Sequence, residues 1–172
     1  MPFAYAVTGC RRDEIVGLRW KEADFNRNQL RLSDSKTGAS IRPLSDVASA
    51  LLAEIGERYG ICGEFVFPAR GGANKPYSGF SKAWHRIVEE NYTAHHLRHA
   101  FASAAADLEY SEITISALLG HGRRGVTSGY IMKSDQYLLS AANKVASYIN
   151  SAMNGEERAS TGEVIHLSKV MG

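Results

Sequence analysis

The chain has 172 residues, of which 44% are hydrophobic and 22% charged, a composition typical of one globular domain with its own core. The net charge of +2 is small, so charge alone does not indicate a nucleic-acid partner. Cys10 and Cys62 form no CxxC pair, which argues against a zinc site or disulfide framework and favours a reducing, cytoplasmic location. We expect neither a secretory signal nor a membrane segment.

The N-terminal half is predicted to hold two helices and a small sheet. In chain order, hydrophobic spacing and turn residues predict a helix at 11–18, strands at 29–32 and 40–43 within the extended region 24–43, and a helix at 45–59. Ser45 or Asp46 is the expected N-cap of the second helix, because a side-chain oxygen there can accept a hydrogen bond from a free backbone amide. Glycine and proline predict a loop over 60–77, with a short strand at 65–67.

The C-terminal half is predicted to be helical. Helices are expected at 78–90, 95–108, 111–119 and 135–153, with a further short helix around Tyr130. The expected fold class is therefore mainly α with a small antiparallel β-sheet. Residues 1–153 are assigned to one domain, and residues 154–172 to a polar linker and a tail with a short strand at 164–167.

Two basic side chains in the N-terminal half are candidates for binding phosphate. Arg11 follows Thr8-Gly9-Cys10 at a helix start, where free backbone amides and a forked guanidinium both favour an anion. Lys36 lies in the turn Ser35-Lys36-Thr37-Gly38 between two predicted strands, from which it can reach a DNA groove or a phosphate. Taken alone, each is better explained as a solvated surface side chain.

His95 and Arg98 lie one helical turn apart, so both can contact a single phosphate. Zinc binding is an alternative interpretation of the string His95-His96-Leu97-Arg98-His99. This alternative is weak, because the two histidines at i and i+4 lack the glutamate of a His-Glu-x-x-His motif and an obvious third ligand.

A last candidate region begins at Leu118-Leu119-Gly120-His121, where glycine ends a helix and histidine follows in the turn. Tyr130 comes nine residues later and is one of eight tyrosines in the chain. In isolation, this histidine and this tyrosine are more simply interpreted as structural. Arg123 and Arg124, between them, are candidates for contacts with a DNA backbone.

The order and spacing of these motifs over residues 8–130 resemble the catalytic domain of tyrosine recombinases, the phage integrase family. The similar segments are the first arginine box Thr8-Gly9-x-Arg11-x-x-Glu14, the lysine hairpin ending in Arg42-Pro43-Leu44, the second arginine box His95-x-Leu97-Arg98-His99, and the His121 to Tyr130 spacing. The family usually has a proline where Ala94 stands. The resemblance implies a DNA breaking–rejoining catalytic fold for residues 1–153.

The resemblance also implies a mechanism. Tyr130 would attack a DNA phosphodiester, form a 3′-phosphotyrosyl link and release a 5′-hydroxyl, and a second strand would reverse the step. Arg11 and Arg98 would hold the nonbridging oxygens, with Glu14 bracing a catalytic arginine or histidine.

The other side chains implied by the resemblance move protons. His95 and His121 would add hydrogen bonds or accept the tyrosine proton, and Lys36 would protonate the leaving oxygen. No metal and no cofactor are expected in this scheme.

The implied partners are double-stranded DNA, further recombinase protomers in a tetramer on DNA, and accessory DNA-bending proteins. Only seven residues precede Thr8. We therefore expect the family's N-terminal core-binding domain to be absent, together with the helix that normally leads into the first arginine box.

Three other functions remain open at this point. They are a type IB topoisomerase-like rejoining enzyme, a non-catalytic DNA-binding remnant of a prophage integrase, and a generic helical interaction domain. The tail raises a further question, because Leu138, Ala142, Val145 and Ile149 form one apolar stripe. This stripe either packs on its own domain or docks on a neighbouring protomer, with 163–168 added as an exchanged strand.

Overall fold

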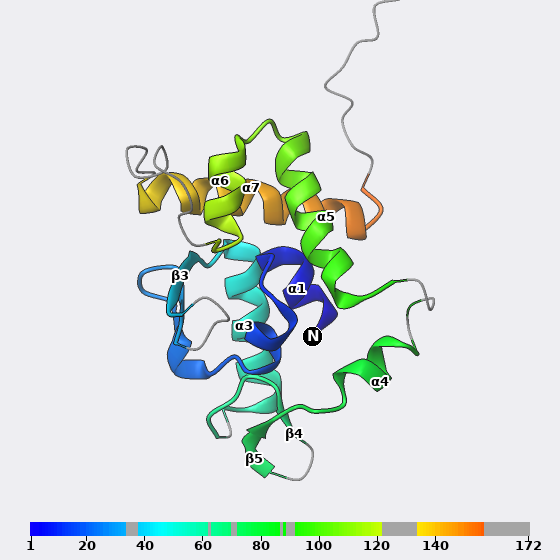
Figure 1. Ribbon diagram of the computed structural model, residues 1–172. Helices are drawn as coiled ribbons and strands as arrows, with labels where there is room; N and C mark the ends of the chain where they lie inside the picture. Colours follow the sequence, from blue (N-terminus) through cyan, green and yellow to red (C-terminus); the bar gives the residue numbers. More distant parts are fainter. Residues whose placement is uncertain are drawn as a thin grey trace, which may run out of the picture.

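The computed structural model describes residues 1–33, 38–61, 63–69, 72–86, 88, 92–121 and 134–156. Its elements are α1 (Pro2–Thr8), α2 (Arg12–Val16), the 3-10 turn η1 (Trp20–Glu22), β1 (Ala23–Asp24), β2 (Gln29–Leu32), β3 (Ser40–Pro43), α3 (Asp46–Tyr59), β4 (Pro68–Ala69), β5 (Gly72–Pro76), α4 (Phe80–Trp84), α5 (Ala94–Asp107), α6 (Glu112–Leu118) and α7 (Asp135–Met153). Helices α5, α6 and α7 gather at one end of the molecule, the β4–β5 hairpin lies at the other, and α1 and α3 lie between them (Figure 1).

The chain begins with a helix, so the expectation that no helix leads into the first arginine box is wrong. Pro2 occupies the first turn of α1, where its missing amide proton costs nothing. Gly9 ends the helix in the left-handed conformation, with φ at 60°. Tyr5 lies buried, and its hydroxyl donates to the Arg12 carbonyl oxygen at 2.9 Å. Burial of this short helix between other elements stabilises it despite its length.

The three-stranded antiparallel sheet has the order β1-β2-β3, and β2 and β3 have the predicted bounds. In the β2–β3 register, Leu30 pairs with Arg42 and Arg31 pairs with Ile41. Leu30 is buried and Arg31 is exposed. Because paired residues in an antiparallel sheet share a face, this register places Arg42 on the inner face.

Two predictions for the middle of the chain are wrong. The loop predicted over 60–77 contains the β4–β5 hairpin, and Phe65 makes a single bridge with Arg19 in place of a strand at 65–67. Among the described residues, the helix predicted over 78–90 is limited to α4, Phe80–Trp84. Trp84 is held by its indole nitrogen, which donates to the Tyr92 carbonyl oxygen at 2.7 Å. This bond between residues eight positions apart fixes how the chain returns toward α5, which helical periodicity cannot reveal.

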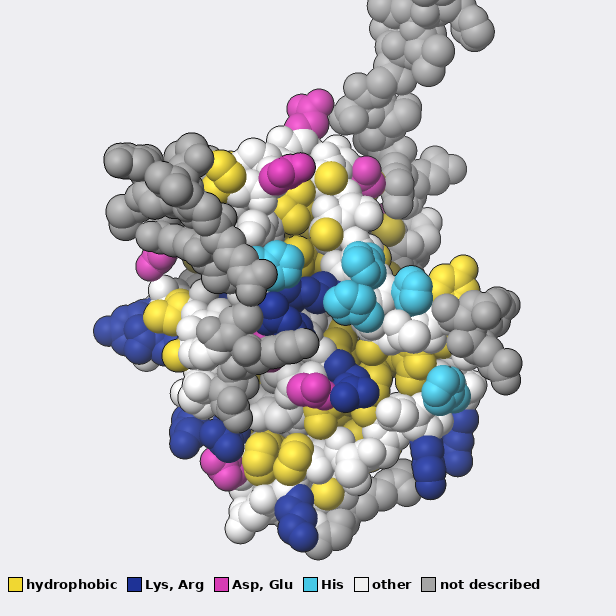
Figure 2. Space-filling view, in the orientation of Figure 1, with side chains coloured by type: hydrophobic (Ala, Val, Ile, Leu, Met, Phe, Trp, Pro, Cys, Tyr) yellow, Lys and Arg dark blue, Asp and Glu magenta, His cyan; other side chains and the backbone are white. Residues whose placement is uncertain are grey.

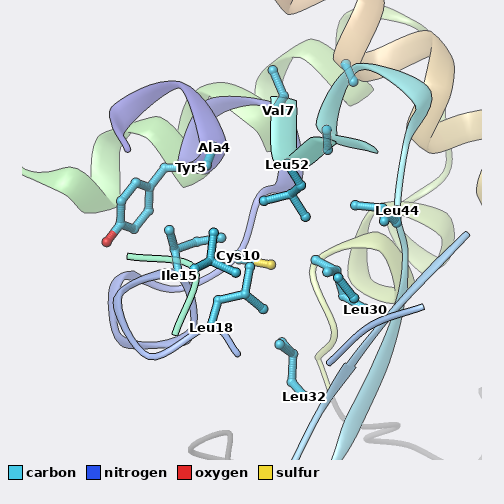
Figure 3. Packing of buried hydrophobic residues seen from close by; sticks show 14 of the residues in the cluster. Ala4, Tyr5, Val7, Cys10, Ile15, Leu18, Leu30, Leu32, Leu44 and Leu52 are labelled. Atoms are coloured by element: carbon cyan, nitrogen blue, oxygen red, sulfur yellow. The ribbon is translucent and has the colours of Figure 1, made fainter. Parts of the chain in front are cut away.

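The buried apolar residues form two clusters. The first lies between α1, α2, α3, α4 and the sheet, and Figure 3 shows Tyr5, Ile15, Leu18, Leu30 and other members of it. The second joins α5, α6 and α7 and includes Phe101, Leu118 and Val145. In the part of the chain that the structure describes, no helix is long and apolar enough to cross a membrane.

Helix α7 has the predicted bounds and packs on its own domain. Ala142 and Val145 of the apolar stripe are buried, and Leu138 and Ile149 pack at the edge of the second cluster. Asn143 also accepts from the Asp46 amide and donates to its carboxylate, both at 2.8 Å. The stripe is therefore part of the core, and the alternative that it docks on a neighbouring protomer is wrong. The helix expected around Tyr130 and the strand at 164–167 lie outside the described residues.

Candidate active site

Arg11 and Glu14 form the first part of the candidate site. Arg11 is the N-cap residue of α2, and its backbone amide donates to Glu14 Oε2 at 2.5 Å. Its guanidinium Nη1 donates to Glu14 Oε1 at 3.0 Å. The capping residues at the start of α2 therefore also fix the direction of the Arg11 side chain, which is only partly exposed.

Glu14 binds a second guanidinium, that of Arg42 on β3. Arg42 Nη2 donates to Glu14 Oε1 at 2.6 Å, and both side chains are buried. Burial alone would raise the pKa of the Glu14 carboxyl. The Arg11 amide and the charge of Arg42 outweigh this effect and lower its pKa, so Glu14 is ionised.

Arg98 is buried and joins distant parts of the chain. Its Nη1 donates to the Gly9 carbonyl oxygen at 2.5 Å, and its Nη2 donates to the Leu119 carbonyl oxygen at 2.9 Å. Burial, followed by the charges of Arg42 and Arg11, lowers its pKa to about 10, so the guanidinium is charged at neutral pH. Gly9 is suited to its place, since a Cβ there would lie 2.7 Å from the Phe101 ring.

His121 contacts Arg98 directly, with 2.9 Å between His121 Nε2 and Arg98 Nη2. Because a guanidinium can only donate, Nε2 is the acceptor in this bond. Partial burial and then the charges of Arg98 and Arg11 lower the pKa of His121. The neutral ring therefore carries its proton on Nδ1, which is available to donate.

His95 lies on the exposed side of α5, with its ring edge-on to His99 at 4.5 Å between centroids. Partial desolvation, then the charges of His99 and Arg98, lower the pKa of His95. His96 has a different role, since its Nδ1 accepts from the Thr93 amide at 2.9 Å and so closes the N-terminus of α5. This cap starts the helix at Ala94 without the proline. Among the described residues, no group of three or more His, Cys, Asp or Glu side chains is placed to hold a metal ion.

Arg11, His95 and Arg98 line one cavity of about 260 Å³, and His121 adjoins it through its bond to Arg98. Figure 2 shows histidine side chains beside a group of Lys and Arg side chains in the middle of this face. Arg11 and Arg42 both bind the Glu14 carboxylate, and Arg98 is close enough to feel its charge. Arg12 and Asp13 also line the cavity and pair with each other. The excess positive charge and the free donors suit an anion such as a phosphodiester.

Four predicted site residues lie outside the described residues: Lys36, Arg123, Arg124 and Tyr130. Their roles stay predictions from the sequence. In the chain, Lys36 lies between β2 and β3, and the other three lie between His121 and α7.

Arg42 is a site residue that the sequence analysis did not single out. It appeared there only as part of the string that follows the lysine turn. The signal was the pairing of the strands, because a register that places Leu30 opposite position 42 turns that side chain inward. An arginine at an inward position requires a buried anionic partner, which is Glu14.

Residues 1–137 match the phage integrase family, which is most of the chain. The chain belongs to the phage integrase family. The prophage integrase IntF of Escherichia coli K12 is 29% identical over 121 residues, which cover 67% of this chain and 26% of that protein. This integrase-family chain thus spans about a quarter of the length of that relative.

Two solved structures of the Tn1549 transposon integrase have a similar fold. One, a complex with circular intermediate DNA, has a TM-score of 0.53 at 17% identity and covers 91% of this chain and 56% of its own. The other, a complex of a variant with transposon right end DNA, has the same TM-score and identity and covers 79% and 55%. The expected fold class, mainly α with a small antiparallel sheet in the tyrosine-recombinase arrangement, is confirmed.

Proposed function

We propose that this chain is the catalytic part of a site-specific DNA recombinase that cleaves and rejoins DNA through a covalent 3′-phosphotyrosyl intermediate. The observation that carries the proposal is the arrangement of Arg11, His95 and Arg98 around one cavity, with His121 bonded to Arg98. These residues come from sequence motifs far apart in the chain, and the fold brings them together. Membership of the phage integrase family supports the same chemistry.

The arginines stabilise the charge that develops on the phosphate. Arg98 is fixed by two backbone carbonyl groups and His121, and a guanidinium carries more N–H donors than these three acceptors use. The remaining donors of Arg98 and those of Arg11 bind the nonbridging oxygens. Because both side chains are already oriented, they need not reorganise as the pentavalent transition state forms.

The two histidines have different tasks in this proposal. His121 uses Nε2 to accept from Arg98, so its Nδ1–H donates to a phosphate oxygen. His95 is exposed and mainly neutral, so it can accept the proton of the attacking hydroxyl. Tyr130 supplies that hydroxyl, and Lys36 protonates the 5′-oxygen that leaves. Atoms balance without another reactant, because the phosphodiester is exchanged for a phosphotyrosine ester of similar energy.

The proposed partners follow from this reaction. The substrate is double-stranded DNA, with Arg123 and Arg124 contacting its backbone, and exchange between two duplexes requires further protomers, assembled as a tetramer. Accessory DNA-bending proteins are proposed as assembly partners. Since the substrate is DNA, the proposed place of action is the bacterial cytoplasm.

Covalent trapping tests the proposal. The full chain is incubated at low salt with short nicked duplexes. Cleavage beside the nick releases a short fragment that diffuses away and cannot rejoin. The sequence around the nick is randomised. We expect a protein–DNA adduct that survives denaturation, and none with Tyr130→Phe, which should bind DNA as the native chain does. An adduct in that variant would show that another residue is the nucleophile.

The same assay separates the other functions. DNA binding without an adduct indicates a non-catalytic remnant, and neither binding nor adduct indicates an interaction domain. Relaxation of supercoiled plasmid without strand exchange indicates a topoisomerase-like enzyme. We expect adduct formation to be unchanged by chelator, and a loss restored by magnesium would refute the metal-independent scheme.

A further inference from the structure

Arg42 is the most deeply buried charged side chain at the site, with only 1% of its surface exposed. Its guanidinium lies between Glu14, which precedes Ile15 of the first buried cluster, and Gly120, which follows Leu119 of the second. On one side, Nη2 donates to Glu14 Oε1, the same oxygen that accepts from Arg11. Arg42 and Arg11 are therefore coupled through one carboxylate oxygen.

On its other side, the Arg42 guanidinium packs directly against the backbone of Gly120. A Cβ at position 120 would lie 2.7 Å from Arg42 Cζ, and Gly120 has φ at +64°. Both the conformation and the space at this position therefore require glycine. Gly120 precedes His121, so the guanidinium defines where the turn that carries this histidine can lie.

The third nitrogen, Nη1, is buried and has no acceptor among the described residues. Arg42 Nε has only a long bond of 3.4 Å to Ser40 Oγ. A buried guanidinium in a site rich in positive charge is unfavourable for stability alone, because Arg11 and Arg98 are also close to it. The buried Nη1 without an acceptor among the described residues therefore favours a functional role for Arg42.

We propose that Arg42 is a positioning residue of the active site, which orients Arg11 through Glu14 and fixes His121 by packing against Gly120. This inference rests on the proposed function where it is tested by the rate of adduct formation. The NMR test of the same inference does not depend on that function. Arg42 lies in β3, directly after the segment that contains Lys36. Arg42 therefore connects strands β2 and β3, which flank the segment with the proposed general acid Lys36, to Arg11, which is proposed to bind the phosphate.

The test compares Arg42→Met and Arg42→Lys with matched substitutions of Arg31, which lies on the neighbouring strand and faces outward. In single-turnover trapping on the nicked duplexes, we expect Arg42→Met to slow adduct formation about 10–100-fold, by analogy with the loss of a residue that orients a metal ligand. DNA affinity should change much less. Arg31→Met should cleave like the native chain.

A double-variant cycle with Arg11→Ala identifies the route of the effect. If Arg42 acts through Arg11, then Arg42→Met slows a chain that already lacks Arg11 far less than it slows the native chain. Independent, multiplied losses would overturn the proposed route through Glu14 and Arg11, and a native rate in Arg42→Met would overturn the whole proposal. A general loss of stability has no reason to produce such coupling.

A spectroscopic measurement decides the proposal even if no adduct forms. Partial burial lowers the pKa of His121 most, and the charges of Arg98, Arg11 and Arg42 lower it further, whereas Glu14 raises it. NMR titration should show a higher pKa for His121 in Arg42→Met and no change in Arg31→Met, and an unchanged value in both would refute the contact. If Arg42→Met does not fold, Arg42→Lys takes its place in the rate cycle. Its His121 ring resonances should then shift, whereas those of Arg31→Lys stay in place.

Discussion

Glu14 is the residue on which the candidate site depends most directly. It accepts from the backbone and side chain of Arg11 and from Arg42, and its own side chain is almost fully buried. The neighbouring acid, Asp13, pairs with Arg12 at the surface and is 82% exposed. Two adjacent carboxylates thus differ mainly in burial and partners, which makes them a natural pair for comparison.

We expect Glu14→Gln to lower the free energy of unfolding by about 3 kcal/mol, because it leaves two guanidinium groups without their buried anion. Asp13→Asn should lower it by less than about 1 kcal/mol, as is usual for an exposed pair. Urea denaturation monitored by circular dichroism measures both. Equal effects of the two variants would show that Glu14 is not a buried bridge.

The histidines predict a dependence of stability on pH. The pKa values of His95 and His121 are lowered in the folded chain, so the unfolded chain binds more protons as the pH falls through the ordinary histidine value of about 6.5. The stability contributed by these groups is complete above that value and is lost as the pH falls toward the folded pKa. Between about pH 7.5 and about pH 5.5, the native chain should therefore become less stable. The loss should be smaller in His121→Gln, and an equal loss in both chains would contradict the assignment for His121.

Gly120 and Gly155 separate backbone strain from crowding. Both have positive φ, but a Cβ at position 155 meets no atom of the described residues within 4 Å. We expect Gly155→Ala to cost about 1 kcal/mol for the left-handed conformation alone. Gly120→Ala should cost about 3 kcal/mol, since it also displaces Arg42. Thermal unfolding of the two variants measures the difference. Similar melting temperatures would mean that the Arg42 side chain moves away from the added Cβ at little cost in stability.

At the scale of elements, hydrophobic periodicity predicted those elements whose buried residues recur at a regular spacing along one face. The bounds of β2, β3 and α7 follow from alternation and from a continuous apolar stripe, and those of α5 and α6 were predicted within one residue. Periodicity failed where a single side-chain contact decides the path, as at Trp84 and Tyr92, or where consecutive residues of a short helix are all buried, as over 4–7 in α1. The site shows the same division. Motifs indicated Arg11, His95, Arg98 and His121, whereas Arg42 depends on strand register and on a partner 28 positions away.

Helix α7 supplies a prediction about truncation. We expect a chain ending at Met132 to lose its cooperative unfolding transition, because it lacks Ala142, Val145 and Ala146, all of which are buried. A chain ending at Asn154 keeps the helix and should unfold like the native one. Calorimetry on the two truncated chains distinguishes them. A stable chain ending at Met132 would show that the second cluster does not need α7.

The chain that ends at Asn154 also tests how protomers assemble on DNA. We expect the chain ending at Asn154 to bind nicked DNA as a protomer but to form fewer higher-order complexes in native gels, if residues 163–168 are exchanged between protomers as proposed from the sequence. Unchanged complexes would assign assembly to other surfaces.

For the whole molecule, the net charge of +2 predicts weak DNA binding that depends steeply on salt. Each phosphate contact contributes about −0.9 to the slope of log affinity against log salt. Arg11→Ala should therefore reduce the magnitude of this slope by about 1, with a similar loss on every sequence. Fluorescence anisotropy over a salt series measures it, with exposed Arg58→Ala on α3 as the control. A slope unchanged by Arg11→Ala would remove Arg11 from the phosphate site.

The bonds of Arg98 to Gly9 and Leu119 have a consequence for a chain that is still being made. The elements with Arg11, Glu14 and Arg42 leave the ribosome first, and those with His95, Arg98 and His121 follow. The elements made first supply only part of the anion site. Arg98, made later, reaches its position only when it can donate to the Gly9 carbonyl oxygen. In the proposed reaction, Arg98 therefore reaches the phosphate site only in chains whose two halves have already joined, and a chain that still lacks α5 has no complete site.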